Sequence, residues 1–351
     1  MLASRRGNVA ILYALMCVPI TLAVGGAIDY SRAVHFRAEV QGVVDSAALA
    51  GATAFVNAAA QTLATNVVTE FMNAGIAKLP PSGTVSFSAP TMTIVLVASK
   101  AAAYQVAVSA TATVNTTFLG ILVPTIAISA TATAENPVVS AATNFSGFSS
   151  AAWDKNTIYW YPIPPGSPNT YVPPNSALVP VWSNAGGVTA ALASVAASQK
   201  IGFALGNVTG GYGGNYGANQ YGSAYLSSHT FYSSLPNPSS SANGYNSTND
   251  PSDPNGVNGN SGNNCSLQTA VVPSSGAVPV APGGSCYPPN TFHYMSPTCS
   301  QIGGQTIRYS WNDMGGRPDD KDYNDAEFSF SCAANASGLG ASGPQNVVLI
   351  Q

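Results

Sequence analysis

RRGNVAILYALMCVPITLAVGGAIDYSRAVHFRAEVQGVVDSAALAGA, residues 5–52, joins an uncharged apolar run to a striped helical pattern. The run, residues 8–28, has about 21 residues, which at about 1.5 Å each match a hydrocarbon core about 30 Å thick. It therefore predicts a single membrane helix. A cleaved secretory signal is the alternative, because Arg5 and Arg6 form a basic start and residues 23–27 are small.

Beyond Asp29 the pattern becomes that of a helix with one apolar face. Apolar residues recur three or four positions apart, at Phe36, Val40, Val43, Ala47, Ala50 and Ala54. The helix is therefore expected to leave the membrane unbroken, and a second helix is expected at residues 61–77. Alternating Val, Ile, Thr and Ala then predict half-buried antiparallel strands at residues 84–88, 92–97, 104–114 and 125–134.

The composition excludes several classes of protein. Only 7% of the 351 residues are charged, with 11 Lys and Arg against 14 Asp and Glu. A net charge of −3 excludes a nucleic-acid binder that relies on basic patches. The 34 Gly and 25 Pro, with abundant Ser, Thr and Asn, are typical of exported proteins.

The fold class expected is α+β in three parts. Residues 1–29 form a cytoplasmic tail and transmembrane helix, residues 30–136 a stem of helix and antiparallel sheet, and residues 137–351 a β-rich, sandwich-like exported domain. Within the last part, residues 237–264 are dominated by turn formers and predict a long disordered loop. A short helix is expected at residues 188–203, and strands at residues 156–161, 176–182, 306–311, 327–332 and 346–350.

The cysteines suggest the compartment. Cys17 lies in the apolar run, and four others fall in the last quarter of the chain: Cys265, Cys286, Cys299 and Cys332. An even number in a region of low charge predicts two disulfides in an oxidising compartment, with three connectivities open. We favour Cys265 with Cys286 and Cys299 with Cys332. A zinc site through Cys286, His293 and Cys299 is the weaker alternative. Because the predicted disulfides need an oxidising compartment, the N-terminus is placed in the cytoplasm and the bulk of the chain outside.

The N-terminal third resembles the TadE/TadG-like proteins of the bacterial tight-adherence (Flp) pilus system. The matching features are Arg5-Arg6-Gly7-Asn8, Pro19 within the apolar run, Gly26-Ala27-Ile28-Asp29-Tyr30 at its exit, and the pattern formed by Val40, Gln41, Asp45, Ala47, Ala48, Leu49 and Ala50. The resemblance covers residues 4–55 well and extends, through the alternating strands, toward residue 136. It implies that residues 30–136 form a pilin-like stem. It also implies a non-catalytic assembly component, anchored in the inner membrane, whose partners are other pilus-assembly or pilin subunits.

Two features of such proteins are missing. Processed pilins carry Glu five residues after the cleaved glycine, but Leu12 stands five residues after Gly7, so prepilin-type cleavage is not expected. Larger TadG-like members have an Asp-x-Ser-x-Ser metal motif that this chain lacks.

Small residues on the striped helix are candidates for partner packing. Close approach to a neighbouring helix is possible at Ala47, Ala50, Gly51 and Ala54, as it is for small residues in other helix interfaces. The alternative is that these residues pack on the chain's own sheet.

An acidic segment, residues 313–327, holds six of the chain's 14 acidic residues. Oxygen ligands for a hard cation are available from Asp313, Asp319, Asp320, Asp322, Asn324 and Asp325. The segment also resembles an Asp-x-Asp-Tyr-Asn-Asp loop of exported bacterial β-sandwich modules, and this resemblance implies calcium. A solvated acidic hairpin and a catalytic carboxylate pair are the alternatives. Because nucleophile, zinc-protease and phosphate-loop motifs are absent from the sequence, we expect no enzyme. The alternative function is a surface adhesin or lectin-like module with a calcium-stabilised head, whose partner would be a glycan or another surface ligand.

Overall fold

The structure is a computed structural model of the whole chain. It describes residues 6–81, 83–95, 103–120, 122–148, 155–168, 170–186, 194–208, 228–235, 267–273, 292, 294–312, 323–333 and 347–350, with side chains of the first helix from residue 13 on, apart from residue 14. The chain divides into two compact units. Unit 1 comprises residues 1–95, 104–136 and 347–351, and unit 2 comprises residues 96–103 and 137–346.

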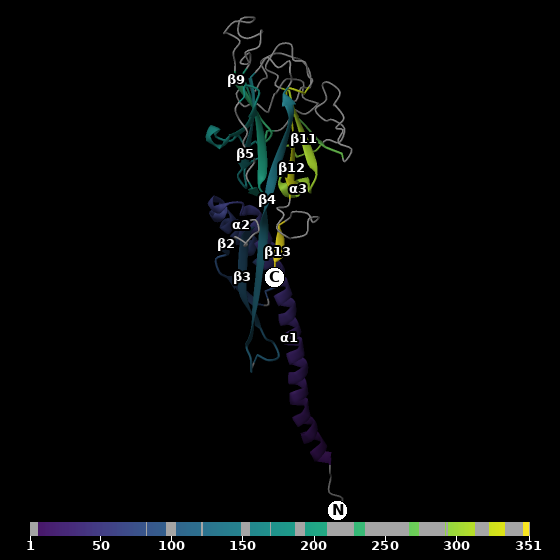
Figure 1. Cartoon of the computed structure of the whole chain (residues 1–351). Coiled ribbons are helices and arrows are strands. Elements are labelled where there is room, and N and C mark those ends of the chain that lie inside the picture. Colours follow the sequence, from purple (N-terminus) through teal and green to yellow (C-terminus); the bar gives the residue numbers. More distant parts are fainter. Residues whose placement is uncertain are drawn as a thin grey trace, which may run out of the picture. The chain divides into compact units, whose positions relative to one another are not determined.

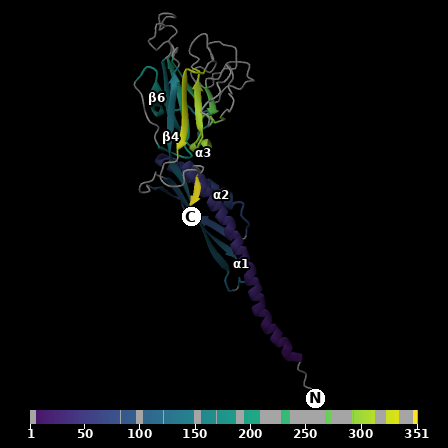
Figure 2. The ribbon, with the colours of Figure 1, turned by 45° about the vertical axis from the view of Figure 1, so that its right-hand side comes forward.

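Unit 1 begins with a long helix and ends with a short strand. Its elements are α1 (Arg6–Ala54), a 3-10 turn η1 (Ala58–Ala60), α2 (Gln61–Ile76), β1 (Gly83–Phe87), β2 (Thr91–Val95), β3 (Ala103–Asn115), the first half of β4 (Thr125–Phe148) and β13 (Val348–Ile350). Both helices and all five strands lie where the sequence pattern predicts them. Figures 1 and 2 show β3 and β4 beside α1, whose N-terminal part extends past the end of this sheet.

The core of unit 1 forms where α1 and α2 cover one face of the sheet. On α1 the buried stripe follows the helical period, with Phe36, Val40 and Val44 at most 2% exposed. On β3 every second residue is buried, from Val106 to Val114, as expected for a strand with one covered face. The two periodicities that identified these elements in the sequence therefore come from one shared core.

Unit 2 is a β-sandwich. One sheet has the order β4-β12-β11-β10, with β7 also paired to β4, and the other has the order β6-β5-β8-β9. Neighbouring strands within each sheet run antiparallel. The remaining elements are β5 (Lys155–Ile163), η2 (Asn175–Ala177), β6 (Val179–Ser183), β7 (Ser194–Ala196), β8 (Lys200–Val208), β9 (Ser228–Tyr232), β10 (Leu267–Val271), α3 (Cys299–Ile302), β11 (Thr306–Trp311) and β12 (Ala326–Ala333).

Aromatic rings fill the space between the two sheets. The Phe203 ring of β8 contacts Tyr309, Phe328 and Phe330 of the opposite sheet, with centroids 4.8, 4.8 and 5.2 Å apart. All four rings are fully buried. Such edge-to-face contacts between large apolar side chains make this the centre of the unit 2 core.

The short helix predicted at residues 188–203 is wrong over its described part. Residues 194–196 form β7 and residues 200–208 form β8. The strand is buried on both faces, because Ala204 faces a second cluster formed with Tyr161, Tyr232 and Leu235. A strand covered on both sides loses the polar alternation that would have distinguished it from a buried helix.

Unit 2 is inserted into a pair of neighbouring strands of unit 1. The first half of β4 pairs antiparallel with β13, and Glu135 lies opposite Val348. The chain therefore leaves unit 1 after Asn136 and returns at Val347, at adjacent positions of one ladder. A short hairpin turn has the geometry to close this gap in place of the whole insertion.

In the described part of the chain, no helix is both long enough and apolar enough to cross a membrane. The membrane span predicted at residues 8–28 is therefore unconfirmed, although the helix itself is present as the first part of α1.

The close packing of α1 against α2 predicts opposite effects for the same substitution at two glycines of α1. A Cβ at Gly51 would lie 2.3 Å from Val68 Cγ2, whereas a Cβ at Gly42 would meet nothing within 4 Å. Gly42→Ala should stabilise the helix by roughly 0.5–1 kcal/mol, and Gly51→Ala should destabilise unit 1 by about 1–3 kcal/mol through overpacking.

Chemical denaturation followed by circular dichroism at 222 nm measures this, because nearly all described helix lies in unit 1. Equal stability of the two variants would show that α1 and α2 do not pack as described.

Candidate functional site on helix α1

The first half of α1 carries an exposed apolar surface. Large apolar side chains from 36% to 72% exposed are Tyr13, Leu15, Met16, Val18, Ile20, Leu22, Val24, Ile28, Tyr30 and Val34. Exposed apolar patches of this kind mark contacts with a membrane or another protein. The surface is therefore the first candidate site of the molecule.

Asp29 lies near the C-terminal end of this surface and holds the loop between β3 and β4. Its Oδ1 accepts the backbone N–H of Thr117 at 3.0 Å, and its Oδ2 accepts those of Phe118 and Leu119 at 2.8 and 2.9 Å. Arg32 lies one turn further on and donates to Thr117 Oγ1 at 2.6 Å. The carboxylate itself is buried, with 1% of its side chain exposed. The loop is thus fixed to α1 by the Asp29 carboxylate and by the hydrogen bond between Arg32 and the Thr117 hydroxyl.

The environment of Asp29 favours its ionised form. Burial acts to raise the pKa of Asp29, but the hydrogen bonds from Leu119, Thr117 and Phe118, together with the nearby Arg32 guanidinium, outweigh this effect. The pKa of Asp29 is consequently lowered from its ordinary value. At neutral pH the carboxylate is charged and keeps all three acceptor contacts.

Two glycines bring the loop against the helix. A Cβ at Gly25 would lie 2.4 Å from Phe118 Cβ, and one at Gly26 would lie 3.5 Å from Leu119 Cδ1. Gly25 therefore leaves the room that the Phe118 side chain needs to lie on α1. Sequence reasoning treated this segment only as the exit of the apolar run and missed the loop contact.

The Gln41 and Asp45 pair of the sequence pattern joins α1 to the sheet. Gln41 Nε2 donates to Asp45 Oδ1 at 2.7 Å and to the Thr131 carbonyl of β4 at 2.8 Å. At the end of the helix, Asn136 Nδ2 donates to the Ala52 and Phe55 carbonyls at 3.0 and 3.3 Å. Asn136 thus binds the chain where α1 ends, and the Ala52 carbonyl accepts from it in addition to the Phe55 N–H.

The small residues proposed for partner packing lie mostly in the core of unit 1. Ala47 and Ala54 are buried, Gly51 contacts α2 and β3, and Ala50 is half-buried. The chain's own packing therefore accounts for the small size required at Gly51. Contact of these residues with another subunit stays a prediction.

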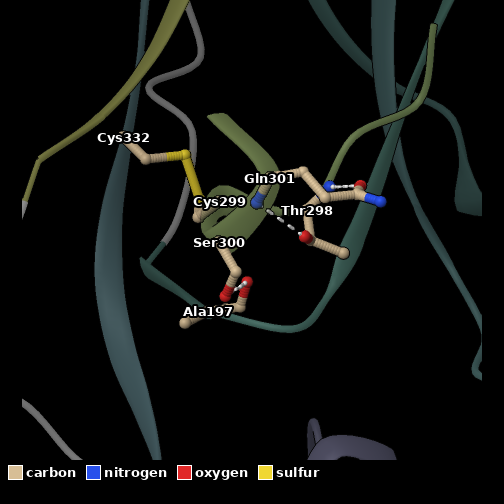
Figure 3. Close-up of a disulfide and its surroundings, with 6 residues drawn as sticks. All are labelled: Ala197, Thr298, Cys299, Ser300, Gln301 and Cys332. Carbon is tan, nitrogen blue, oxygen red and sulfur yellow. Dashed lines mark hydrogen bonds between the residues drawn. A yellow bond between two sulfur atoms is a disulfide. The ribbon is translucent and has the colours of Figure 1, made fainter. Parts of the chain in front are cut away.

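The structure joins Cys299 to Cys332, the pairing favoured from the sequence, with Cα atoms 5.5 Å apart. Cys299 begins α3, whose N-terminus is closed by a capping box between Thr298 and Gln301 (Figure 3). Ser300 N and Oγ both donate to the Ala197 carbonyl, at 3.1 and 3.2 Å. The bridge thus fastens α3 to β12. Cys265 and Cys286 lie outside the described residues.

Of the predicted cation ligands, the structure describes two. Asn324 and Asp325 directly precede β12, and Asp325 is 7% exposed. Tyr323 has a positive φ of 55°, which is uncommon outside glycine. Asp313, Asp319, Asp320 and Asp322 lie outside the described residues. Among the residues that the structure does describe, no cluster of potential metal ligands is found.

Buried tyrosines in unit 2 serve its packing. Burial raises the pKa of Tyr161 to about 12, and its hydroxyl shares a 2.6 Å hydrogen bond with Ser234 Oγ. Burial also raises the pKa of Tyr309, whose hydroxyl donates to the Met295 carbonyl. Both groups stay protonated at neutral pH and hold loops to strands.

The Asp29 contacts predict how the loop responds to substitution and acid. Asp29→Asn should speed amide hydrogen exchange at Phe118 and Leu119, because an amide oxygen binds N–H groups more weakly than a carboxylate does. Because the folded-state pKa is lowered, the difference from the wild type should be present above the ordinary Asp pKa near 3.9 and disappear as pH falls through the lowered value.

Asp45→Asn is the matched control, since Asp45 accepts from Gln41 on the same helix and does not bind the loop. Unchanged exchange at Phe118 and Leu119 in Asp29→Asn would contradict the described role of Asp29.

Comparison with known proteins gives a family match on α1. No curated protein and no solved structure matches the chain. The family match falls on the helix that carries the exposed apolar surface and the Asp29 contacts. Residues 7–54, nearly the whole of α1, match the model of the Tad family, the Flp pilus-assembly TadE/G-like proteins.

Proposed function

We propose that this protein is a non-catalytic structural component of Flp pilus assembly. In this proposal residues 8–28 of α1 anchor it in the inner membrane as a single pass, residues 30–136 contact other pilus-assembly or pilin subunits, and residues 137–346 form an exported head. The observation that carries the proposal is the family match over α1 together with the exposed apolar surface on the same helix.

The anchor is supported by charge and exposure. Residues 8–28 contain no charged side chain. Large apolar side chains from Tyr13 to Ile28 remain exposed within the folded chain. Water contact with this surface costs free energy in proportion to its apolar area, at about 25 cal/mol per Å². A lipid environment removes that cost.

The orientation is supported by the disulfide of unit 2. Structural disulfides persist in oxidising compartments and are rare in the cytosol. The Cys299–Cys332 bridge therefore favours a head outside the cytoplasm, with the short N-terminus inside. The distribution of positive charge does not decide the orientation, because Arg5 and Arg6 before the apolar run are balanced by Arg32 and Arg37 after it. The orientation therefore rests on the disulfide.

The insertion topology provides a direct test of the assembly role. Because Asn136 and Val347 are adjacent across the β4–β13 ladder, replacing residues 137–346 with an Asn-Gly turn should leave unit 1 folded. This variant should stay in the membrane fraction and co-purify with the same pilus-assembly proteins as the full chain.

A control variant that stops after Asn136 also removes β13 and should be less stable than the hairpin variant. Loss of both membrane association and partners from a folded hairpin variant would overturn the assembly role of the stem. Normal pili with lost surface adhesion would instead assign a binding function to the head.

Calcium binding in the acidic segment is proposed as the means of stabilising the head. The ligands would be Asp313, Asp319, Asp320, Asp322, Asn324 and Asp325, because carboxylate and amide oxygens are the ligands that calcium takes. Two of them, Asn324 and Asp325, directly precede β12. An ion here would lie within the chain segment closed by the Cys299–Cys332 bridge, whose ends are 33 residues apart.

Calcium at a hundredfold excess over its Kd should raise the melting temperature of the head by roughly 5–10 °C relative to chelator. Tryptophan fluorescence of the oxidised full chain measures this, because all four Trp lie between residues 153 and 311. Asp320→Asn with Asp322→Asn should remove the shift. Glu327→Gln removes a carboxylate at the end of the same segment that pairs with Arg308 and is not among the predicted ligands, so this variant should keep the shift. A shift that survives the double substitution would exclude these ligands.

A further inference from the structure

The loop between β3 and β4, residues 116–124, presents apolar side chains beside the proposed anchor. Phe118, Leu122 and Val123 are 47%, 66% and 45% exposed. The loop contains no charged residue, and neither do the two flanking strand segments, since residues 103–134 are uncharged throughout. An apolar loop tip is unusual, because tips in contact with water are normally built from small and polar residues.

The tip is held in place on α1. Asp29 accepts three of its backbone N–H groups, and Arg32 binds the Thr117 hydroxyl. The Phe118 side chain lies against Gly25, one turn before Asp29 on α1, whereas Arg32 lies one turn after Asp29. The exposed apolar groups therefore belong to a defined surface that continues the exposed surface of α1.

Much of the described backbone of the tip is hydrogen-bonded within the protein. Thr116 N donates to the Pro124 carbonyl at 3.1 Å, and Leu122 N and Val123 N donate to the Leu119 carbonyl at 2.8 Å. With the three groups bound by Asp29, six N–H groups of the loop have partners within the protein. Exposed loop backbone usually relies on water for this, and unsatisfied backbone is not tolerated in lipid.

The length of the apolar run places the loop at the edge of the membrane. If residues 8–28 cross the hydrocarbon core, the core ends near Ile28. The loop contacts α1 from Gly25 to Arg32, one turn on either side of that point. Tyr30, 68% exposed, stands at the same level, where aromatic rings with a polar tip are favoured.

We propose that the β3–β4 loop is a second membrane contact, in which Phe118, Leu122 and Val123 insert into the lipid at the boundary between headgroups and acyl chains. The inference rests on the proposed anchoring of residues 8–28. The loop adds apolar area beside the helix, and its attachment to Asp29 fixes the stem at one height above the bilayer. Lipid suits this surface because the surface is continuous with the anchor and uncharged.

Spin labels on the full chain in phosphatidylethanolamine and phosphatidylglycerol vesicles test this proposal. In a Cys17→Ser background, labels are placed by Leu122→Cys and Val123→Cys in the loop, by Ile20→Cys in the anchor, and by Ser46→Cys on α1 beyond the loop. These four side chains are exposed, so labelling leaves the core intact. Accessibility to oxygen, which enriches in lipid, is compared with accessibility to a water-soluble nickel complex.

The proposal expects the oxygen-to-nickel ratio at positions 122 and 123 to be several-fold higher than at position 46, and lower than at position 20. A ratio at 122 and 123 equal to that at 46, with a high ratio at 20, would overturn the loop contact and leave the anchor intact. Low access to both reagents at 122 and 123 would assign the surface to a neighbouring subunit and also overturn the proposal. A low ratio at position 20 would remove the anchor and the loop contact together.

Discussion

The packing of the second half of α1 on α2 and β3 is the contact on which unit 1 depends. A glycine at position 51 brings the two helices within reach of each other, and Gly75 of α2 approaches Val43 in the same way, with a Cβ there 2.5 Å from Val43 Cγ1. Asn136 then closes the end of α1 by binding its last carbonyls. Because Asn136 is also the last residue of unit 1 before the insertion, the point where the head departs is fixed by the core of the stem.

A second fixed point lies at the other end of the sheet. Asp29 binds the β3–β4 loop, and the Gln41 amide binds β4 between these two points. Hydrogen bonds between side chains and backbone groups therefore join α1 to the sheet at three levels. Asp29 and Gln41 of α1 supply the side chain at two of them, and Asn136 of β4 supplies it at the third. Bonds of this kind set the register of the helix along the sheet, which apolar packing alone leaves less well defined because it is not directional.

Sequence reasoning found the elements whose pattern reflects a single covered face. Alternation from Val106 to Val114 identified β3, and the three-and-four spacing from Phe36 identified α1. It failed at residues 200–203, which were expected to end a helix and instead begin β8. Ile201, Phe203 and Leu205 of this strand face one cluster and Ala204 another, and burial on both faces is decided by distant strands. The role of Asp29 was equally hidden, since its partners are backbone groups 88 to 90 positions away. Small residues at Ala47 and Gly51 were visible, but the sequence does not distinguish packing on α2 from packing on another subunit.

The two halves of α1 draw their stability from different sources. From Phe36 to Ala54 the helix is covered by α2 and the sheet, and the core contacts stabilise it. From Tyr13 to Val24 its large side chains are exposed, and Pro19 removes one backbone hydrogen bond of the helix. An isolated helical segment of this length is marginal in water, because helix formation has a costly nucleus and most helical stability in proteins comes from packing. In the proposed anchoring, lipid supplies the apolar surroundings of the first half of α1, and the Asp29 contact with the loop lies where these surroundings give way to the chain's own core.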